Sequence, residues 1–278
     1  MAILSELIFY PVKSCAGISV AEAVLSEAGL QVDGVCDREW MVVDEAGQFL
    51  TQREHPRMAL IVPRIANGTL ELSAPGMETH GIAPSATPAC VVTIWDDSVQ
   101  AADCGDASAA WFTQAIGAPC RLVHFPNAAR RWTGTKWTGG VAAPTRFADG
   151  YPMLLIGAAS LADINEKLLA IGRQALPMNR FRPNLVVDGI GAFEEDYCES
   201  LRFGDAEIRP VKPCPRCPIP SIDQATGVPG PDPLDVLQSY RRKPQLDDAV
   251  CVGMNCIVSA GAGQRLKVGQ QVDVTLAF

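Results

Sequence analysis

The sequence predicts a mainly β protein of the α+β class, with barrel-like β architecture to which a few helices are added. Short apolar or alternating runs recur at close spacing along the 278 residues, and turn residues separate them. Only two segments carry a clear helical pattern. A hydrophobic content of 48% is enough for a buried core, and the chain is long enough for two domains.

Hairpin signals dominate the first half of the chain. The turn after the first strand holds Lys13, Ser14 and Cys15, and loops that join strands are good places for ligand contacts. A helix is predicted to begin near Asp106 or Ser108 and to end at Gly117. The predicted strand pairs are Ile3 to Val12 with Ile18 to Leu25, Glu39 to Val43 with Gln48 to Thr51, Ala59 to Ile65 with Thr69 to Ser73 across Asn67-Gly68, and Val91 to Trp95 with Val99 to Ala101.

A long segment at residues 128–148 opens the second half; it is basic and aromatic and has no periodicity. We interpret it as a solvated, partly mobile connection, and a rim over a ligand pocket is the alternative. A capped helix is predicted from Ser160, with Asp163 in its first turn. The predicted strands are Met153 to Ile156, a hairpin of Leu201 to Phe203 with Ala206 to Val211, and a closing hairpin of Leu266 to Val268 with Val272 to Leu276.

Two thiols, an arginine and four prolines crowd into a few residues after Val211. Each proline removes an amide donor, so we expect a stiff loop that is neither helix nor central strand. Arg216 favours the thiolate form of a neighbouring cysteine, which makes Cys214 and Cys217 candidates for a soft-metal ligand, a redox pair or a nucleophile. Inert loop cysteines are one alternative. A zinc site completed by Cys251 and Cys256 is another, although the second pair has an atypical spacing.

Charge and cysteine usage limit the function classes. The net charge of −8 and the pI near 4.9 disfavour binding to nucleic acid or to an anionic membrane surface. The first residues carry no basic segment, and no apolar run reaches the roughly 18 residues of a membrane helix. The ten cysteines are scattered through a chain too large to need disulfide bonds. We therefore expect a soluble, cytoplasmic protein with free thiols.

Four short motifs, in the same order along the chain, resemble those of one known family. The motifs are Tyr10-Pro-Val-Lys13-Ser14-Cys15, Asp37-Arg38-Glu39-Trp40, Phe181-Arg182-Pro183-Asn184 and Cys214-Pro215-Arg216-Cys217. Together they resemble the MOSC-domain proteins that carry an N-terminal MOSC β-barrel domain, such as the mitochondrial amidoxime reducing component and its YcbX-like bacterial relatives. The resemblance covers essentially the whole chain. It implies an N-terminal MOSC β-barrel domain at residues 1–125 and a MOSC domain at residues 126–278.

The resemblance also implies a bound molybdenum cofactor, Mo-molybdopterin, which is a pterin dithiolene with a terminal phosphate. Cys217 would be the protein's ligand to molybdenum, since a thiolate is a suitable soft donor and prolines stiffen its loop. Asp149 matches an aspartate near the metal that could relay protons to the substrate, and an ordinary loop turn is the alternative. The residues implied to contact the cofactor are Lys13, Ser14, Arg38, Thr51, Arg53, Arg182 and Asn184.

The implied activity is that of a molybdoenzyme that reduces small N-hydroxylated compounds, namely amidoximes, hydroxylamines or hydroxylaminopurines. The chain contains no Cys-x4-Cys-x2-Cys run of a plant-type ferredoxin, so electrons are expected from a separate protein of the ferredoxin, flavoreductase or cytochrome type. Gly150-Tyr151 stands where the mitochondrial proteins have a Thr-Ser pair, so we do not expect the hydroxyl contacts that this pair would make with the cofactor. A molybdenum-cofactor carrier or sulfur-transfer protein is the first alternative. A non-enzymatic β protein that binds zinc or nothing is the second.

Overall fold

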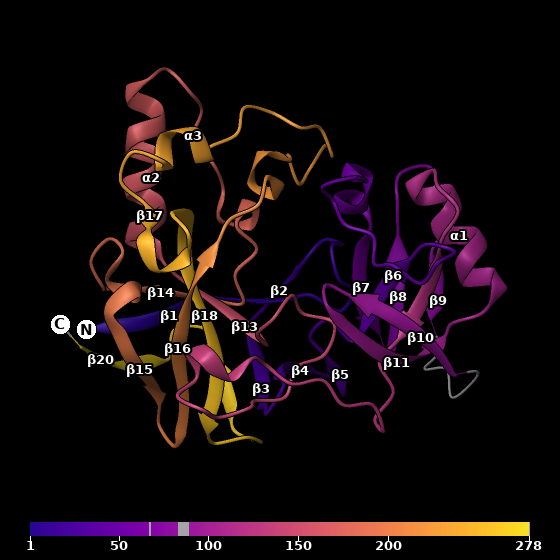
Figure 1. Ribbon diagram of the computed structural model, residues 1–278, viewed down its shortest axis with the longest axis horizontal. Coiled ribbons are helices and arrows are strands. Elements are labelled where there is room, and N and C mark those ends of the chain that lie inside the picture. Colours follow the sequence, from indigo (N-terminus) through magenta and orange to yellow (C-terminus); the bar gives the residue numbers. More distant parts are fainter. Residues whose placement is uncertain (67, 83–88, 278) are drawn as a thin grey trace.

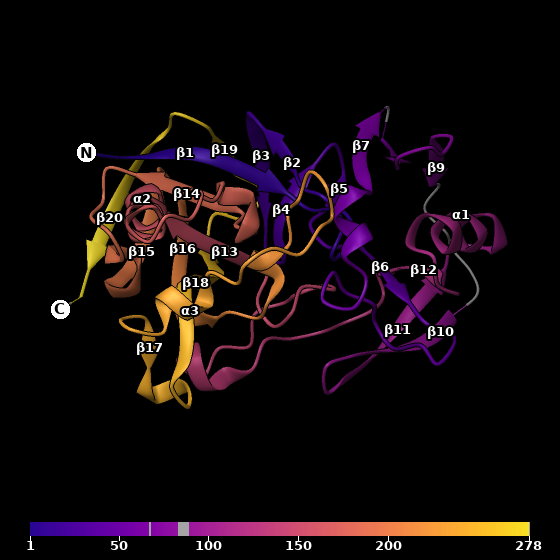
Figure 2. The same cartoon turned by 90° about the horizontal axis from the view of Figure 1, so that it is seen from above.

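The computed structural model describes residues 1–66, 68–82 and 89–277. The chain forms two lobes that lie side by side (Figure 1). One lobe contains both termini and a β-barrel, and the other is built from the segment between β5 and β12 and carries α1 at its outer end (Figure 2). The mainly β class with added helices is confirmed. Among the described helices, none is long and apolar enough to span a membrane.

Seven strands close into the barrel. Strand β1 comes from the start of the chain and lies between β14 and β20, so the barrel joins the first and last parts of the sequence. All the pairs are antiparallel except β13 with β14, which α2 connects. In order around the ring the strands are β13 (Met153–Gly157), β14 (Leu185–Asp188), β1 (Ala2–Phe9), β20 (Gln271–Leu276), β15 (Cys198–Phe203), β16 (Ala206–Pro215) and β18 (Ala249–Ala260), which pairs with β13.

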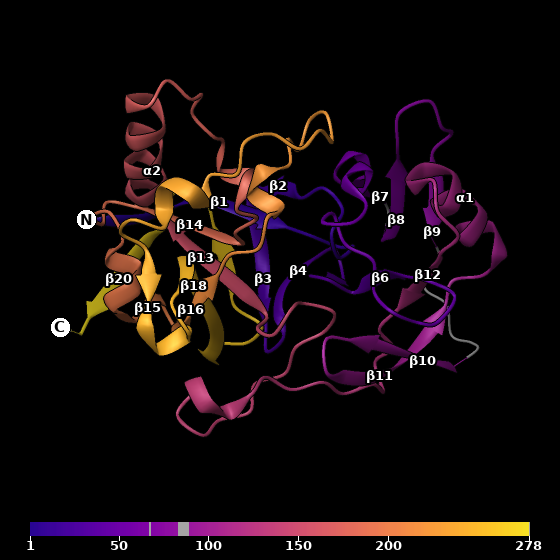
Figure 3. The same cartoon turned by 45° about the horizontal axis from the view of Figure 1, so that its top comes forward.

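Smaller sheets make up the rest of the structure. One contains β10 (Ala89–Ile94), β11 (Asp97–Asp103), β12 (Arg121–His124) and β6 (Trp40–Val43), and another contains β7 (Val62–Ala66), β8 (Thr69–Ser73) and β9 (His80–Ile82). A third sheet contains β19 (Arg265–Lys267), β3 (Glu22–Ser26), β4 (Gly29–Val32) and β5 (Val35–Cys36), and its strands β3 and β4 lie between the lobes (Figure 3). The remaining elements are β2 (Ile18–Val20), β17 (Arg242–Lys243), α1 (Asp106–Ile116), α2 (Ala158–Ala170), α3 (Leu234–Leu237) and six short 3-10 turns: η1 (Pro56–Leu60), η2 (Thr135–Trp137), η3 (Met178–Arg180), η4 (Glu194–Tyr197), η5 (Ile219–Ser221) and η6 (Pro244–Leu246).

Several local predictions are confirmed. Strand β2 pairs with β1 across the turn that holds Lys13, but the predicted strand Ile18 to Leu25 is split, and its second part, β3, pairs with β4 and β19 instead. Strand β10 pairs with β11, and β15 pairs with β16. Helix α1 ends at Gly117, whose φ of 85° is left-handed as a C-terminal glycine allows. Strands β7 and β8 also pair as predicted, and Asn67 in their turn lies outside the described residues. After β6 the predicted hairpin closes with an isolated bridge between Val43 and Phe49.

The predicted closing hairpin across Gly269 is wrong. Both strands exist, but β19 pairs with β3, whereas β20 pairs with β1 and β15. Long-range partners therefore replace the local one. In the barrel β20 gains a partner on each side, and its buried Val272 joins the main core.

The second helix begins two residues earlier than predicted, at Ala158. Ser160 does not cap it. Its hydroxyl donates to Glu195 Oε2 at 2.7 Å and accepts from the Phe193 amide at 2.8 Å. The serine side chain thus connects the helix to the loop before β15 and leaves the helix terminus without a side-chain cap.

The proline-rich segment is partly a strand, which corrects the expectation of a loop from Pro213 onward. Strand β16 continues to Pro215 and pairs with β18 through several register shifts. Its pairing with β15 ends at Ile208, so the proline-containing half is bonded along one side only. Proline is tolerated in this position because no second ladder requires its missing amide hydrogen. The loop proper begins at Arg216.

Candidate functional site

A cavity of about 370 Å³ brings together every residue predicted to bind the cofactor or to act in catalysis. The contributing segments come from both lobes: the turn after β1, the residues before and after β6, the segment before β13, the residues before β14 and the loop after β16. The predicted residues that line it are Lys13, Ser14, Arg38, Thr51, Arg53, Asp149, Arg182, Asn184 and Cys217. The structure therefore places the nine residues in one site, while their individual roles stay predictions.

Four residues that line this cavity have a left-handed backbone although none is glycine. The φ angles are 64° at Ser14, 48° at Arg38, 54° at Trp95 and 58° at Arg182. Such a conformation costs on the order of 1–3 kcal/mol at each residue and persists only where the surroundings hold it. Strained residues concentrated around one cavity indicate that side-chain placement there is favoured over backbone relaxation.

Tyr10 lies between the two strained arginines. The Cζ atoms of Arg38 and Arg182 are 4.3 and 4.4 Å from the centre of its ring, within the range of a cation–π contact. Burial raises the pKa of Tyr10 to about 12, although both arginines oppose this shift. The ring therefore remains a neutral surface that positions two guanidinium groups at the cavity.

Arg182 places a buried positive charge in the wall of the cavity. It is 9% exposed, and among the described residues no hydrogen bond or carboxylate partner is found for its guanidinium. Burial lowers its pKa as a result. A buried, unpaired guanidinium is unfavourable alone and binds an anionic group strongly. Arg182 therefore gives the cavity a preference for anions.

The side chain of Asn184 is occupied by the protein itself. Its oxygen accepts from Arg38 Nη1 at 2.9 Å and from the Leu154 amide at 3.2 Å. Its nitrogen donates to the Ile8 carbonyl at 3.1 Å and to Asp37 Oδ2 at 2.9 Å. Two donors and two lone pairs are the full capacity of an amide. Asn184 therefore holds Arg38 and Asp37 in place, a role that the sequence did not indicate.

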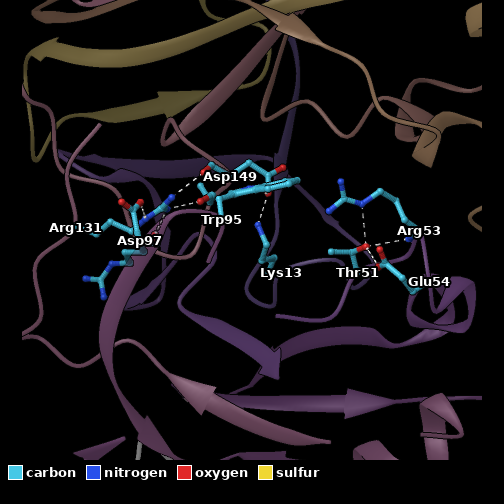
Figure 4. A network of polar contacts seen from close by, with 10 residues as sticks. Lys13, Thr51, Arg53, Glu54, Trp95, Asp97, Arg131 and Asp149 are labelled. Carbon is cyan, nitrogen blue, oxygen red and sulfur yellow. Dashed lines mark hydrogen bonds and ion pairs between the residues drawn. The ribbon is translucent and has the colours of Figure 1, made fainter. Parts of the chain in front are cut away.

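Lys13 and Asp149 form an ion pair inside the cavity, and Trp95 Nε1 donates to the same carboxylate at 3.2 Å (Figure 4). Lys13 is buried, whereas the Asp149 side chain is 72% exposed because it faces the cavity. Desolvation alone would raise the pKa of Asp149, but the charge and hydrogen bond of Lys13 outweigh it and hold the pKa well below its usual range. Asp149 is therefore a carboxylate at neutral pH, able to accept hydrogen bonds and to orient a donor.

Arg131 fixes the segment that carries Asp149, so the interpretation of residues 128–148 as a solvated connection is correct only in part: residues 139–142 are exposed, whereas Arg131 and Phe147 are buried. The Arg131 side chain is 5% exposed and donates to the carbonyls of Arg146, Ala148 and Asp149. It also donates to Asp97 Oδ2 at 2.7 Å (Figure 4). A single guanidinium thus ties this segment to itself and to the start of β11.

The four cysteines of the candidate zinc set lie in two places, two at the cavity and two buried in β18. Arg216 Nη1 donates to Cys214 Sγ at 3.3 Å, yet burial raises the pKa of the Cys214 thiol. Both cysteines line the cavity and are partly exposed. Cys251 and Cys256 are buried in β18. The predicted zinc set is not assembled, since in residues 1–66, 68–82 and 89–277 no three His, Cys, Asp or Glu side chains are grouped to hold a metal.

Sequence reasoning missed several residues of the site. Trp95, Lys212 and Asn255 also line the cavity. A reciprocal pair of amides joins Gln52 to Gln224 with distances of 3.1 and 2.9 Å, and Gln52 also donates to the Ser14 carbonyl at 2.7 Å. No local motif marks these residues, because they come together only through long-range contacts: Lys212 pairs with Asn255 in the barrel, and Gln52 and Gln224 join segments far apart in the sequence.

The chain is similar to several known proteins. Residues 1–119 match the model of the MOSC N-terminal beta barrel domain, and residues 142–273 match the MOSC domain. Mitochondrial amidoxime reducing component 2 of Rattus norvegicus is 37% identical over 86% of this chain and 72% of the relative. Mitochondrial amidoxime-reducing component 1 of Homo sapiens is 34% identical over the same shares. The YUAD protein from Bacillus subtilis, a solved structure, covers the whole chain at 12% identity with a TM-score of 0.43.

These matches extend over most of the chain and include every residue that lines the cavity, whereas Arg131 lies between the two matched ranges. The chain therefore belongs to the family of MOSC-domain proteins that includes the mitochondrial amidoxime reducing components.

Proposed function

We propose that this protein is a molybdenum-cofactor-dependent reductase of small N-hydroxylated compounds and that it receives electrons from a separate donor protein. One observation carries the proposal: Cys217 shares a cavity with Arg182, a buried guanidinium for which no partner is found among the described residues. A thiol suits a soft metal, and an unpaired arginine suits an anion. The relatives named amidoxime reducing components supply the substrate class.

The residues present fit such a cofactor. Cys217 would supply the thiolate to molybdenum, on a loop that Arg180 braces through the Pro220 carbonyl at 3.1 Å and Asp223 at 2.9 Å. Arg38 and Arg182 would hold the negatively charged end of the cofactor. Asn184 would act through Arg38 because its own amide is already fully bonded. Ser14, Thr51 and Arg53 would complete the binding wall.

When bound, the cofactor would supply the two electrons of the reaction, in which an N–OH group, two electrons and two protons give N–H and water. The protein's part is to bind the substrate, orient it and manage the protons. Asp149 is held as a carboxylate by Lys13 and Trp95. It would therefore accept hydrogen bonds from the substrate's N–OH group and from the water that is released. Lys13 is the adjacent cationic donor.

The experiment that tests the function is reduction of benzamidoxime by protein purified from a host that makes molybdenum cofactor, with reduced methyl viologen as the electron source. We expect Cys217→Ala to lower the rate at least about 100-fold, because the protein would lose its ligand to the metal. Cys214→Ala is the matched control, since it removes a thiol three residues away. It should retain most of the activity.

An unimpaired Cys217→Ala protein would refute the assignment of the ligand. Equal losses in the two variants would indicate a dithiol site instead. A persulfide on Cys217, detected by mass spectrometry in protein that reduces no N-hydroxylated compound, would favour the sulfur-transfer alternative.

A further inference from the structure

Trp95 has an unusual position for a tryptophan. It lies in the turn between β10 and β11, its φ is 54°, and 46% of its surface is exposed although it lines the cavity. A left-handed backbone at a large residue is strained and persists only where other contacts hold it. A large, partly exposed aromatic ring therefore lines a cavity that also holds several charged side chains.

Three neighbours fix this ring. Its Nε1 donates to Asp149 Oδ1 at 3.2 Å (Figure 4). The Cζ atom of Arg53 lies 4.7 Å from the ring centre, and the ring of Phe49 lies at 5.1 Å with an angle of 59° between the planes. Arg53 is held in turn, because its Nε donates to Thr51 Oγ1 at 3.1 Å. The indole is therefore pre-organised, and its exposed surface remains available to a ligand.

We propose that Trp95 is a specificity-determining residue that stacks on planar, ring-bearing N-hydroxylated substrates, an inference that rests on the proposed function. An indole offers a wide π surface, and any planar ring can stack on it without a specific hydrogen-bond pattern. Because the same indole is bonded to Asp149, a substrate on Trp95 lies beside the carboxylate that would contact its N–OH group. An aliphatic amidoxime of the same reactivity has no ring with which to use this surface.

The test compares benzamidoxime with acetamidoxime, which share the reacting group and differ in the ring. The measured quantity is the ratio of their kcat/KM values in the cofactor-loaded protein. Trp95→Ala should lower this ratio about 10-fold, mainly through the KM of benzamidoxime. Trp95→Phe keeps an aromatic ring but lacks the N–H group that reaches Asp149, so it should preserve most of the ratio. Trp132→Ala removes another exposed tryptophan, outside this cavity, and should leave the ratio unchanged.

Equal losses for both substrates in Trp95→Ala would overturn the proposal, since they would show that Trp95 only orients Asp149. An unchanged ratio would overturn it as well. If the wild-type protein reduces neither compound, calorimetric titration with benzamidoxime and with acetamidoxime still tests the stacking role of Trp95. Tighter binding of benzamidoxime than of acetamidoxime, lost in Trp95→Ala, would support the stacking role while the proposed reaction fails. Equal binding of the two compounds would reject the stacking role.

Discussion

Arg131 and Arg182 are both buried arginines near the same cavity, yet their guanidinium groups differ in hydrogen bonding. Arg131 is 6% exposed and donates to three backbone carbonyls and to Asp97. Arg182 is 9% exposed and is stacked on Tyr10, and the described part of the chain offers its guanidinium no hydrogen bond. Their burial is almost the same, so the difference lies in the partners.

The comparison separates a structural charge from a binding charge. A buried charge that is fully hydrogen-bonded stabilises the segments around it, whereas an unpaired one lowers the stability of the protein until an anion binds. Arg131 therefore stabilises the segment that carries Asp149. Arg182 offers an unpaired positive charge to which an anionic ligand can bind. Substitution of each arginine tests this contrast, and a pH titration tests Asp149, whose backbone carbonyl Arg131 holds. The expected effects decrease in that order.

The largest effect should come from Arg131→Leu. The change leaves the carbonyls of Arg146, Ala148 and Asp149 without their donor, and we expect the free energy of unfolding to fall by about 2–4 kcal/mol. Urea unfolding followed by circular dichroism measures it. Arg130→Leu is the control, because Arg130 is exposed and donates only to carbonyls of its own loop. A loss below about 0.5 kcal/mol in Arg131→Leu, the range of a surface change, would contradict the structural role.

Arg182→Met should have a smaller effect of the opposite sign. Removal of an uncompensated buried charge is expected to leave the cofactor-free protein as stable as before or to stabilise it by about 1 kcal/mol. Inorganic phosphate should raise the Tm of the wild-type protein through binding, and it should raise the Tm of the variant less. A destabilisation as large as that of Arg131→Leu would show that Arg182 has a structural partner, and it would contradict the difference proposed between the two arginines.

The smallest effect concerns pH and Asp149. Its pKa in the folded protein is held below the ordinary value of about 3.9, so its contribution to stability is present above about pH 4 and is lost as the pH falls further. The stability difference between the wild type and Asp149→Asn should therefore be largest at pH 7 and should shrink toward pH 3 in urea titrations. It should stay below about 1 kcal/mol because the carboxylate is 72% exposed. A difference that grows toward acid would contradict the direction of the shift.

Local patterns in the sequence predicted most of the hairpins and helix α1, whereas the residues that gather in the cavity were implied by the resemblance to a family. They did not predict the closure of the barrel, because β1 and β20 pair across almost the full length of the chain. They also did not predict the role of Arg131, since its acceptors are backbone carbonyls that any residue could supply. Trp95 and Asn255 were missed for other reasons: Trp95 reaches Asp149 only when distant segments of the chain come together, and Asn255 reaches the cavity through the pairing of β18 in the barrel. Asn184 was found through a motif, but only its four hydrogen bonds show that it acts on Arg38.

We propose that the cavity holds a molybdenum cofactor through Cys217. This binding is tested by the molybdenum and oxidised-pterin content of the wild type, Cys217→Ala and Cys214→Ala, all purified from a host that makes the cofactor. If Cys217 is the ligand, we expect near-stoichiometric molybdenum and pterin in the wild type and in Cys214→Ala, and loss of molybdenum from Cys217→Ala. Zinc in place of molybdenum, or neither metal nor pterin in the wild type, would contradict it.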